Sequence, residues 1–183
     1  LAQAHGKRFA LPLWAEIHPD DSQDSRATRL VNIAAEIGSR WGMSIFLVLD
    51  AFFAVGPVFA VAAASKGALH ILTRAKKNIV AFQQPPPPRP HRKGRRRMYG
   101  RKLKLMKLFD TRPQDFLSAK TIIYCKQETV RYLVLDLVWK PVKGVVRFIL
   151  IESSRGRIIL MSSDLTIEPL IALNLYTARV RIE

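Results

Sequence analysis

Asp50 is the one acidic side chain inside an apolar stretch that runs from Ile45 to Ala64. A carboxylate in that place can take part in chemistry if a buried strand ends there and presents it. Open α/β sheets bind ligands and hold catalytic groups at the carboxyl ends of their strands. Asp50 is therefore the first candidate for an active-site residue.

The elements around Asp50 decide between that interpretation and a membrane span. An aspartate in a span costs about 2.5–3.5 kcal/mol on insertion scales, which by itself does not exclude a span. Local signals favour another structure: a short apolar strand at Ser44 to Leu49, a helix at Pro57 to Ser65 that proline can open, and a second strand at Ala68 to Thr73. Strand, helix and strand form a βαβ unit, so we expect no membrane span.

Three polar residues near the end of the chain form a second candidate group. Tyr176, Arg179 and Glu183 are three and four residues apart in a helix expected from Pro169 to Glu183. This spacing places them on one helix face. The alternative is an ordinary amphipathic helix whose exposed side carries an Arg–Glu pair.

A basic segment suggests the partner. The chain of 183 residues has a net charge of +16, which attracts polyanions. Ten Lys or Arg lie between Arg89 and Lys107, after the proline run Pro85 to Pro88. We expect an exposed basic loop that passes into a strand over residues 103–109 and contacts phosphates, although a solvated linker has the same composition. The cations expected to contact DNA here and after the second strand are Arg74, Lys76, Lys77, Arg92, Lys93, Arg95, Arg96, Arg97, Arg101 and Lys102.

The remaining elements follow from periodicity and turn residues. Alternation predicts a strand over Lys7 to His18, and Asp24 or Ser25 can cap a helix that ends at Gly42. That helix has an apolar stripe of Leu30, Ala34, Ile37 and Trp41. Four further strands are expected over residues 121–126, 131–139, 144–153 and 156–163. The single cysteine, Cys125, excludes an internal disulfide and suits a reducing compartment.

Several of these stretches together resemble a known family. They are FLVLDAFFAVGP, HILTRAKKNIVAF, PPPPRPHRKGRRRMYGRKLKL and SSDLTIEPLIALNLYTARVRIE. In order and spacing they resemble the DDE transposases of bacterial insertion sequences, in the group marked by a Tyr-x2-Arg-x3-Glu-x6-Lys signature. The match to that signature is YTARVRIE, and the resemblance covers nearly the whole chain.

The resemblance implies an α/β fold of the RNase H-like type: a mixed sheet flanked by helices, with a β-rich insertion before the final helix. Residues 1–183 would be a partial catalytic domain, with a Pro-rich and basic insert at about 83–107 and a β-rich segment at about 119–162. The implied function is DNA binding and metal-dependent DNA strand cleavage and transfer during transposition.

The resemblance also implies roles for the candidate residues. In the family, three carboxylates hold two Mg²⁺ or Mn²⁺ ions, which are hard ions that prefer oxygen ligands. By position, Asp50 matches the second acid and Glu183 the third, while Tyr176 and Arg179 match residues that contact DNA near the cut. The implied partner is double-stranded DNA, at element ends and target. The intact protein is expected to be cytoplasmic and nucleoid-associated, and whether it acts as a monomer or as a homodimer is left open by the sequence.

Two parts of the family pattern do not appear in this sequence. The first catalytic aspartate would lie upstream of Leu1, and the signature lysine would follow Glu183. We therefore expect a transposase fragment that does not cleave DNA as an isolated chain. For Asp164, in SSDL, a turn or helix-cap role is favoured over that of the missing acid. The main alternative function is a non-catalytic basic nucleic-acid-binding module, and a weaker one is a protein held at an anionic membrane surface.

Overall fold

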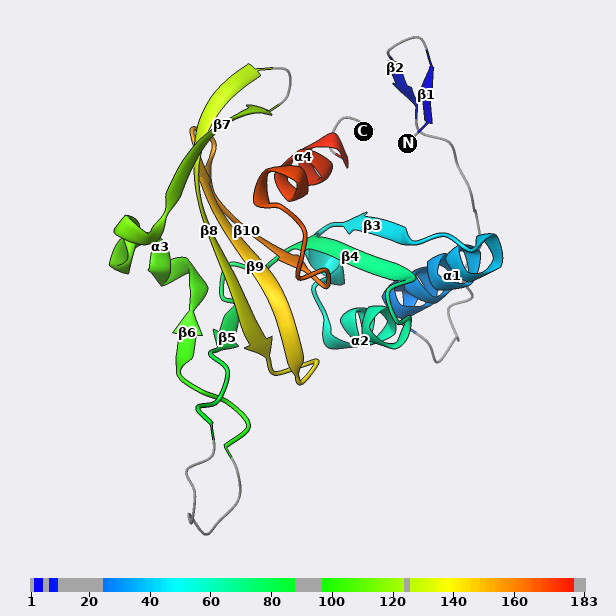
Figure 1. The fold of residues 1–183 in the computed structure, drawn as a ribbon, viewed down its shortest axis with the longest axis horizontal. Coiled ribbons are helices and arrows are strands. Elements are labelled where there is room, and N and C mark those ends of the chain that lie inside the picture. The colour runs from blue at the N-terminus through cyan, green and yellow to red at the C-terminus, as the bar shows by residue number, and fades with distance from the viewer. Residues whose placement is uncertain (1, 5–6, 10–24, 88–96, 124–125, 180–183) are drawn as a thin grey trace.

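The computed structural model describes residues 2–4, 7–9, 25–87, 97–123 and 126–179 (Figure 1). The described part is a mixed α/β structure built on an open, mostly antiparallel sheet of eight strands. Its strand order is β3-β4-β10-β9-β8-β5-β6, with β7 paired to β8. The predicted class, a mixed sheet flanked by helices, is confirmed. Apart from this sheet, β1 (Ala2–Ala4) and β2 (Lys7–Phe9) pair antiparallel, and the rest of the strand predicted up to His18 lies outside the described residues.

The βαβ unit predicted around Asp50 is present. β3 (Ile45–Leu49) is followed by the 3-10 helix η1 (Ala51–Phe53), α2 (Gly56–Ala64) and β4 (Leu69–Arg74). β3 and β4 pair in parallel. No helix in the described ranges is long and apolar enough to cross a membrane. The apolar stretch is therefore divided between a strand and a short helix.

The preceding helix, α1 (Arg26–Trp41), begins and ends where the sequence signals predict. The Thr28 backbone N–H donates to Ser25 Oγ at 3.2 Å, and Gly42 ends the helix with φ of 62°. A left-handed residue at this position favours glycine. The predicted apolar stripe was wrong in part, because Trp41 is 56% exposed while Val31 is fully buried. The buried face of the helix includes the small residues Ala27 and Gly38 and packs against α2 and the sheet, which allows close packing.

The antiparallel half of the sheet comprises β7 (Leu117–Ile123), β8 (Lys126–Trp139), β9 (Gly144–Ser153) and β10 (Gly156–Ser162). The strands predicted over 131–139, 144–153 and 156–163 correspond to β8, β9 and β10, with β9 at the bounds expected. The strand predicted over 121–126 was wrong in its bounds, because it overlaps β7 only from residue 121 to 123 and Lys126 already belongs to β8. β10 pairs antiparallel with β4, so the β-rich segment continues the sheet of the βαβ unit. The chain then returns to this unit through α4 (Pro169–Arg179).

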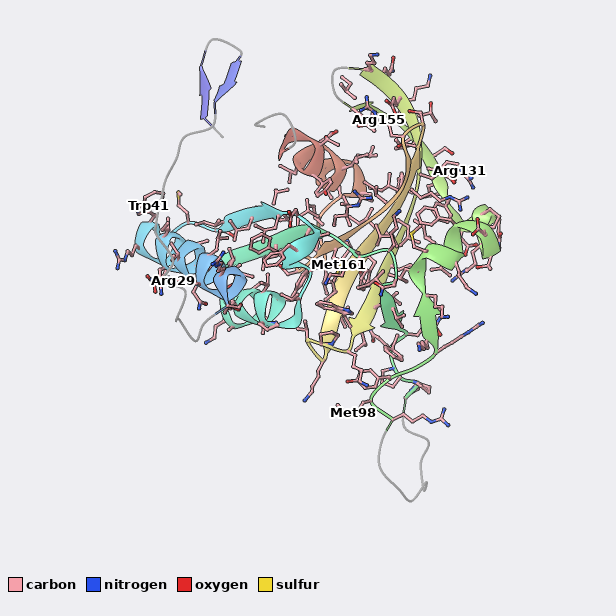
Figure 2. The ribbon with its side chains drawn as sticks, turned by 180° about the vertical axis from the view of Figure 1, so that it is seen from behind. Arg29, Trp41, Met98, Arg131, Arg155 and Met161 are labelled. Atoms are coloured by element: carbon pink, nitrogen blue, oxygen red, sulfur yellow. The ribbon has the colours of Figure 1, made fainter. Side chains whose placement is uncertain are left out.

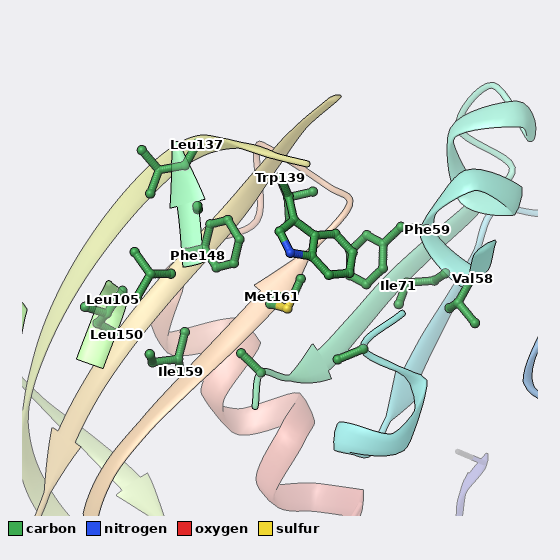
Figure 3. Packing of buried hydrophobic residues seen from close by; sticks show 14 of the residues in the cluster. Val58, Phe59, Ile71, Leu105, Leu137, Trp139, Phe148, Leu150, Ile159 and Met161 are labelled. Atoms are coloured by element: carbon green, nitrogen blue, oxygen red, sulfur yellow. The ribbon is translucent and has the colours of Figure 1, made fainter. Parts of the chain in front are cut away.

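Both faces of the sheet are buried, and alternate residues of each central strand belong to different clusters. In β4, Ile71 packs with α1 and α2, whereas Leu72 packs with α4. In β9, Phe148 and Ile149 divide in the same way. In Figure 1, α1 and α2 cover one face and α4 the other. Figure 3 shows the first cluster, where the rings of Phe59 and Trp139 meet edge to face at 5.4 Å. Burial on two faces explains the nearly continuous apolar runs in these strands.

The sheet ends at a hairpin formed by β5 (Val80–Phe82) and β6 (Lys102–Lys104). The predicted strand over 103–109 was wrong after Lys104, where the chain enters the 3-10 helix η2 (Leu105–Lys107) and then α3 (Leu108–Thr111) and η3 (Pro113–Asp115). Leu105, Leu108 and Phe109 are all buried, at helical spacing rather than in alternation.

Candidate active site and nucleic-acid interface

Asp50 lies directly after β3, at the carboxyl edge of the parallel pair. Its Oδ1 accepts a hydrogen bond from the Phe52 backbone N–H at 2.8 Å, so it caps η1. Its carbonyl oxygen accepts a hydrogen bond from the Thr73 hydroxyl, which links the ends of β3 and β4. The side chain is partly exposed. Since a carboxylate can accept about four hydrogen bonds, one cap leaves Asp50 able to bind a further ligand.

The second candidate group lies only partly within the described structure. Tyr176 is 9% exposed and belongs to the apolar cluster between α4 and the sheet, with Leu72 and Ile149. The Arg179 side chain and all of Glu183 lie outside the described residues. The joint site of Asp50 and Glu183 and the DNA contacts of Tyr176 and Arg179 therefore stay predictions. A packing role for Tyr176 was missed, although its place four residues after Ala172 and three after Leu173 was a signal for it.

The predicted metal site depends on Asp50 and Glu183, of which the structure describes only Asp50. Among the described residues, no three His, Cys, Asp or Glu side chains form a group that could hold a metal ion. The only predicted metal ligand in that part of the chain is Asp50, and a single carboxylate does not make a two-metal site. The expected Mg²⁺ or Mn²⁺ stays a prediction.

Asp164 forms a turn, as expected. Its Oδ1 accepts hydrogen bonds from the Thr166 backbone N–H at 2.8 Å and from the Thr166 hydroxyl at 2.6 Å. Burial alone would raise the pKa of Asp164, but these bonds and the nearby charges of His70 and Arg147 bring the pKa below its ordinary value. Asp164 follows the pairing of Ser163 with Ile71 and so lies toward the amino end of β4, away from Asp50. It shapes the connector that leads into α4.

Arg147 holds the same connector to the sheet. Its Nε and Nη2 each donate to Asp136 across β8 and β9 at 2.8 Å, and its Nη1 donates to the Ile167 carbonyl oxygen at 3.1 Å. The hydrogen bonds with Asp136 raise the pKa of Arg147. Sequence reasoning placed Asp136 in the sheet, which is confirmed, but missed this pair. The pair could be predicted only from the hairpin register, in which Asp136 lies opposite Arg147.

The segment after Asp50 carries positive charge without compensation. No acidic residue occurs between Asp50 and Asp110. Of the described lysines and arginines in this segment, Arg74 is half-buried and the others are exposed. No described acidic group lies within 4.0 Å of any of them. The described lysines and arginines of this segment are Lys66, Arg74, Lys76, Lys77, Arg97, Arg101, Lys102, Lys104 and Lys107. Clustered cations of this kind bind phosphates with release of counterions.

The β5–β6 hairpin presents part of this charge. The Gln83 backbone N–H donates to the Arg101 carbonyl oxygen at 3.0 Å, and the Gly100 N–H donates to the Gln83 carbonyl oxygen at 2.9 Å. The rings of Phe82 and Tyr99 lie 5.1 Å apart. These contacts join the two sides of the basic loop, whose described end carries the exposed Met98 (Figure 2). The predicted Arg92, Lys93, Arg95 and Arg96 lie outside the described residues.

Comparison with known proteins leaves the transposase resemblance resting on residue patterns. No family model matches the chain, and no curated protein sequence matches it either. The candidate site is therefore described by its own geometry. The capped carboxylate of Asp50 lies at the end of β3, and α4 packs on the sheet face that α1 and α2 leave free. The cationic β5–β6 hairpin lies at the other edge of the sheet.

Proposed function

We propose that this chain is part of the RNase H-like catalytic domain of a DDE transposase. In this proposal it binds double-stranded DNA and contributes Asp50 and Glu183 to metal-dependent phosphoryl transfer. The observation that carries the proposal is the place of Asp50, at the carboxyl end of β3 within a parallel βαβ unit. This is where an open α/β sheet holds catalytic groups.

Two features of the chain support a catalytic role for this carboxylate. The backbone of Asp50 is held by Thr73 and its side chain by Phe52, so its orientation is set before any ligand arrives. α4, which leads toward Glu183, packs through Tyr176 on a cluster that includes Val48 of the same strand. If both carboxylates hold Mg²⁺ or Mn²⁺, the ions supply Lewis-acid stabilisation of the attacking and leaving oxygens.

Mn²⁺ binding by two matched variants tests the proposal. Asp50→Asn and Asp164→Asn each remove one negative charge, and the asparagine side chain can accept the same backbone hydrogen bond. We expect Asp50→Asn to weaken Mn²⁺ binding about tenfold or more, measured by electron paramagnetic resonance with duplex DNA present, while Asp164→Asn leaves it unchanged. Equal effects of the two substitutions would contradict a metal site at Asp50.

The acid-free cationic segment favours a second candidate function, a non-catalytic nucleic-acid-binding module. Such a protein would bind DNA without any need for Asp50. Asp50→Asn would then leave DNA affinity equal or slightly higher, since negative charge is removed, and would have no effect on Mn²⁺ binding. Measurement of both ligands on the same variant separates the two functions.

A further inference from the structure

The base of the basic loop is tightly constrained at Gly100. A Cβ atom on this residue would lie 2.6 Å from the Gln84 carbonyl oxygen and 2.9 Å from that of Gln83. Both are backbone atoms, so they cannot move aside as the end of a flexible side chain would. With the Gln83 hydrogen bonds and the Phe82–Tyr99 ring contact, Gly100 forms what we call the loop neck.

The loop neck continues directly into the exposed cations of β6. The backbone of Arg101 is held by Gln83, and Phe82 pairs with Lys102 in the hairpin register. Leu103 is only 9% exposed and points into the core, so Lys102 and Lys104 on either side of it project into solvent. Alternate residues of a strand lie about 6.7 Å apart. This distance is comparable with the spacing of successive phosphates along one DNA strand.

We infer that the loop neck fixes Lys102 and Lys104 as a preformed pair of cations on one face of β6 that binds the phosphate backbone of duplex DNA, with Gly100 as its positioning residue. The inference rests on the DNA binding of the proposed function and adds which surface does it. Preformed cations lose less conformational entropy on binding than cations on a free loop, and so bind more tightly. The partner proposed is a nucleic acid, because each of its nucleotides carries a phosphate, so negative charges at a spacing comparable with that of Lys102 and Lys104 continue along its whole length.

Gly100→Ala tests the inference without changing any charge. Gly144→Ala is the matched control, because a Cβ there would meet its nearest atom, Val142 Cγ1, at an ordinary 3.7 Å. Binding of a duplex DNA oligonucleotide is measured by fluorescence anisotropy over a salt series of about 50–200 mM. We expect Gly100→Ala to weaken binding about three- to tenfold, the effect of breaking one hydrogen bond in the neck, and to flatten the salt dependence. Gly144→Ala should match the unaltered chain in both.

A second pair of variants covers a folding defect in Gly100→Ala. Tyr99→Phe keeps the ring contact with Phe82, and Tyr99→Ala removes it. We expect Tyr99→Phe to bind as the unaltered chain does and Tyr99→Ala to bind more weakly. Unchanged affinity and salt slope in both Gly100→Ala and Tyr99→Ala would overturn the inference but leave the proposed function standing. Absence of salt-dependent DNA binding by the unaltered chain, or tighter binding to phosphatidylserine vesicles, would overturn both the inference and the DNA partner.

Discussion

Two regions of the molecule differ in whether their positive charges have acidic partners. The first comprises the arginines of β8 to β10, and the second comprises the cations from Arg74 to Lys107. In the first region, Arg131 donates to Glu152 at 2.9 Å and to the Pro113 carbonyl oxygen at 2.6 Å. Arg157 donates to Glu152 at 2.7 Å and to Asp110 at 2.6 Å. Figure 2 shows Arg131 beside α3, on the antiparallel part of the sheet.

These arginines also lie over aromatic rings. Arg131 is 5.5 Å from the centre of the Phe116 ring, and Arg157 is 5.2 Å from that of Phe109. Together the two arginines hold α3 and η3 against the long strands. In the segment from Arg74 to Lys107, by contrast, no acid occurs in the sequence and no described acid reaches its described cations. Positive charge therefore stabilises the fold in one region and is available to a ligand in the other.

The largest effect should come from removing charge in the acid-free segment. Replacing Lys102, Lys104 and Lys107 together by glutamine should weaken duplex DNA binding about a hundredfold at low salt. The slope of log affinity against log salt should fall by about 0.9 for each phosphate that the protein no longer neutralises. The denaturation midpoint should hardly change, because all three side chains are exposed. Anisotropy titrations measure the affinity and its slope, and urea unfolding measures the midpoint.

Substitution is a sharper test than deletion here. Deleting residues 89–107 would also remove Leu103 and Leu105, which are buried in the core. If the triple variant kept full affinity and slope, DNA would have to bind elsewhere, for instance at Lys76 and Lys77. The contrast between the two regions would then lose its functional meaning.

A smaller effect, on stability alone, is expected at Arg147. Arg147→Met removes three hydrogen bonds that join β8, β9 and the connector before α4. We expect the free energy of unfolding to fall by about 1–2 kcal/mol, since Asp136 is partly exposed and water replaces some of the loss. The DNA salt slope should not change. A variant that lost DNA affinity without losing stability would show that this paired arginine also serves a ligand.

Asp50 is the last acid before the acid-free segment. Asp50→Ala should lower the free energy of unfolding by about 1 kcal/mol, because the cap on η1 is lost. Asp50→Asn should lower it little, because the side-chain oxygen of asparagine can still accept the hydrogen bond from the Phe52 backbone N–H. Urea denaturation of the two variants measures the difference. If both lost the same amount, the carboxylate charge, and not the cap, would be what the fold requires.

The smallest effect should be the pH dependence of Asp164. Its pKa is lower in the folded protein, so its ionised form stabilises the fold above the unfolded value of about 3.9, and this stabilisation is lost as pH falls through the folded pKa. The unaltered chain should therefore be more stable than Asp164→Asn at pH 7, by an amount that shrinks below about pH 4. Urea unfolding from neutral to acid pH tests this. A difference that stayed constant with pH would assign the effect to geometry instead of charge.

Much of the local structure could be predicted from sequence. The βαβ unit around Asp50, the cap at Ser25 and the strand at 144–153 follow from apolar runs and turn residues that act over a few positions. The orientation of α1 was less predictable, because Trp41 looked like a core residue and lies largely exposed. Which helix face packs is set by the surface it meets, and that surface belongs to α2, β3 and β4, which all come later in the chain.

The candidate site divides in the same manner. The place of Asp50 at a strand end follows from the sequence, whereas the burial of Tyr176 depends on apolar residues of distant strands, among them Leu72 of β4 and Ile149 of β9, that share its cluster. The Asp136–Arg147 pair and the loop neck at Gly100 each depend on a hairpin register. No single stretch of the sequence specifies such a register. Residues with similar signals in the sequence therefore have different roles, which depend on the residues that surround them in the folded protein.

The sequence by itself determined the order of the elements and the separation of its charges, with acids kept out of the stretch from Asp50 to Asp110. Turn residues, alternation and charge runs encode these properties locally. Only the tertiary structure decided that β10 would join β4 and that a helix would cover each face of the sheet. Those choices depend on burying the apolar side chains of distant strands at the same time, and such burial is a property of the whole chain.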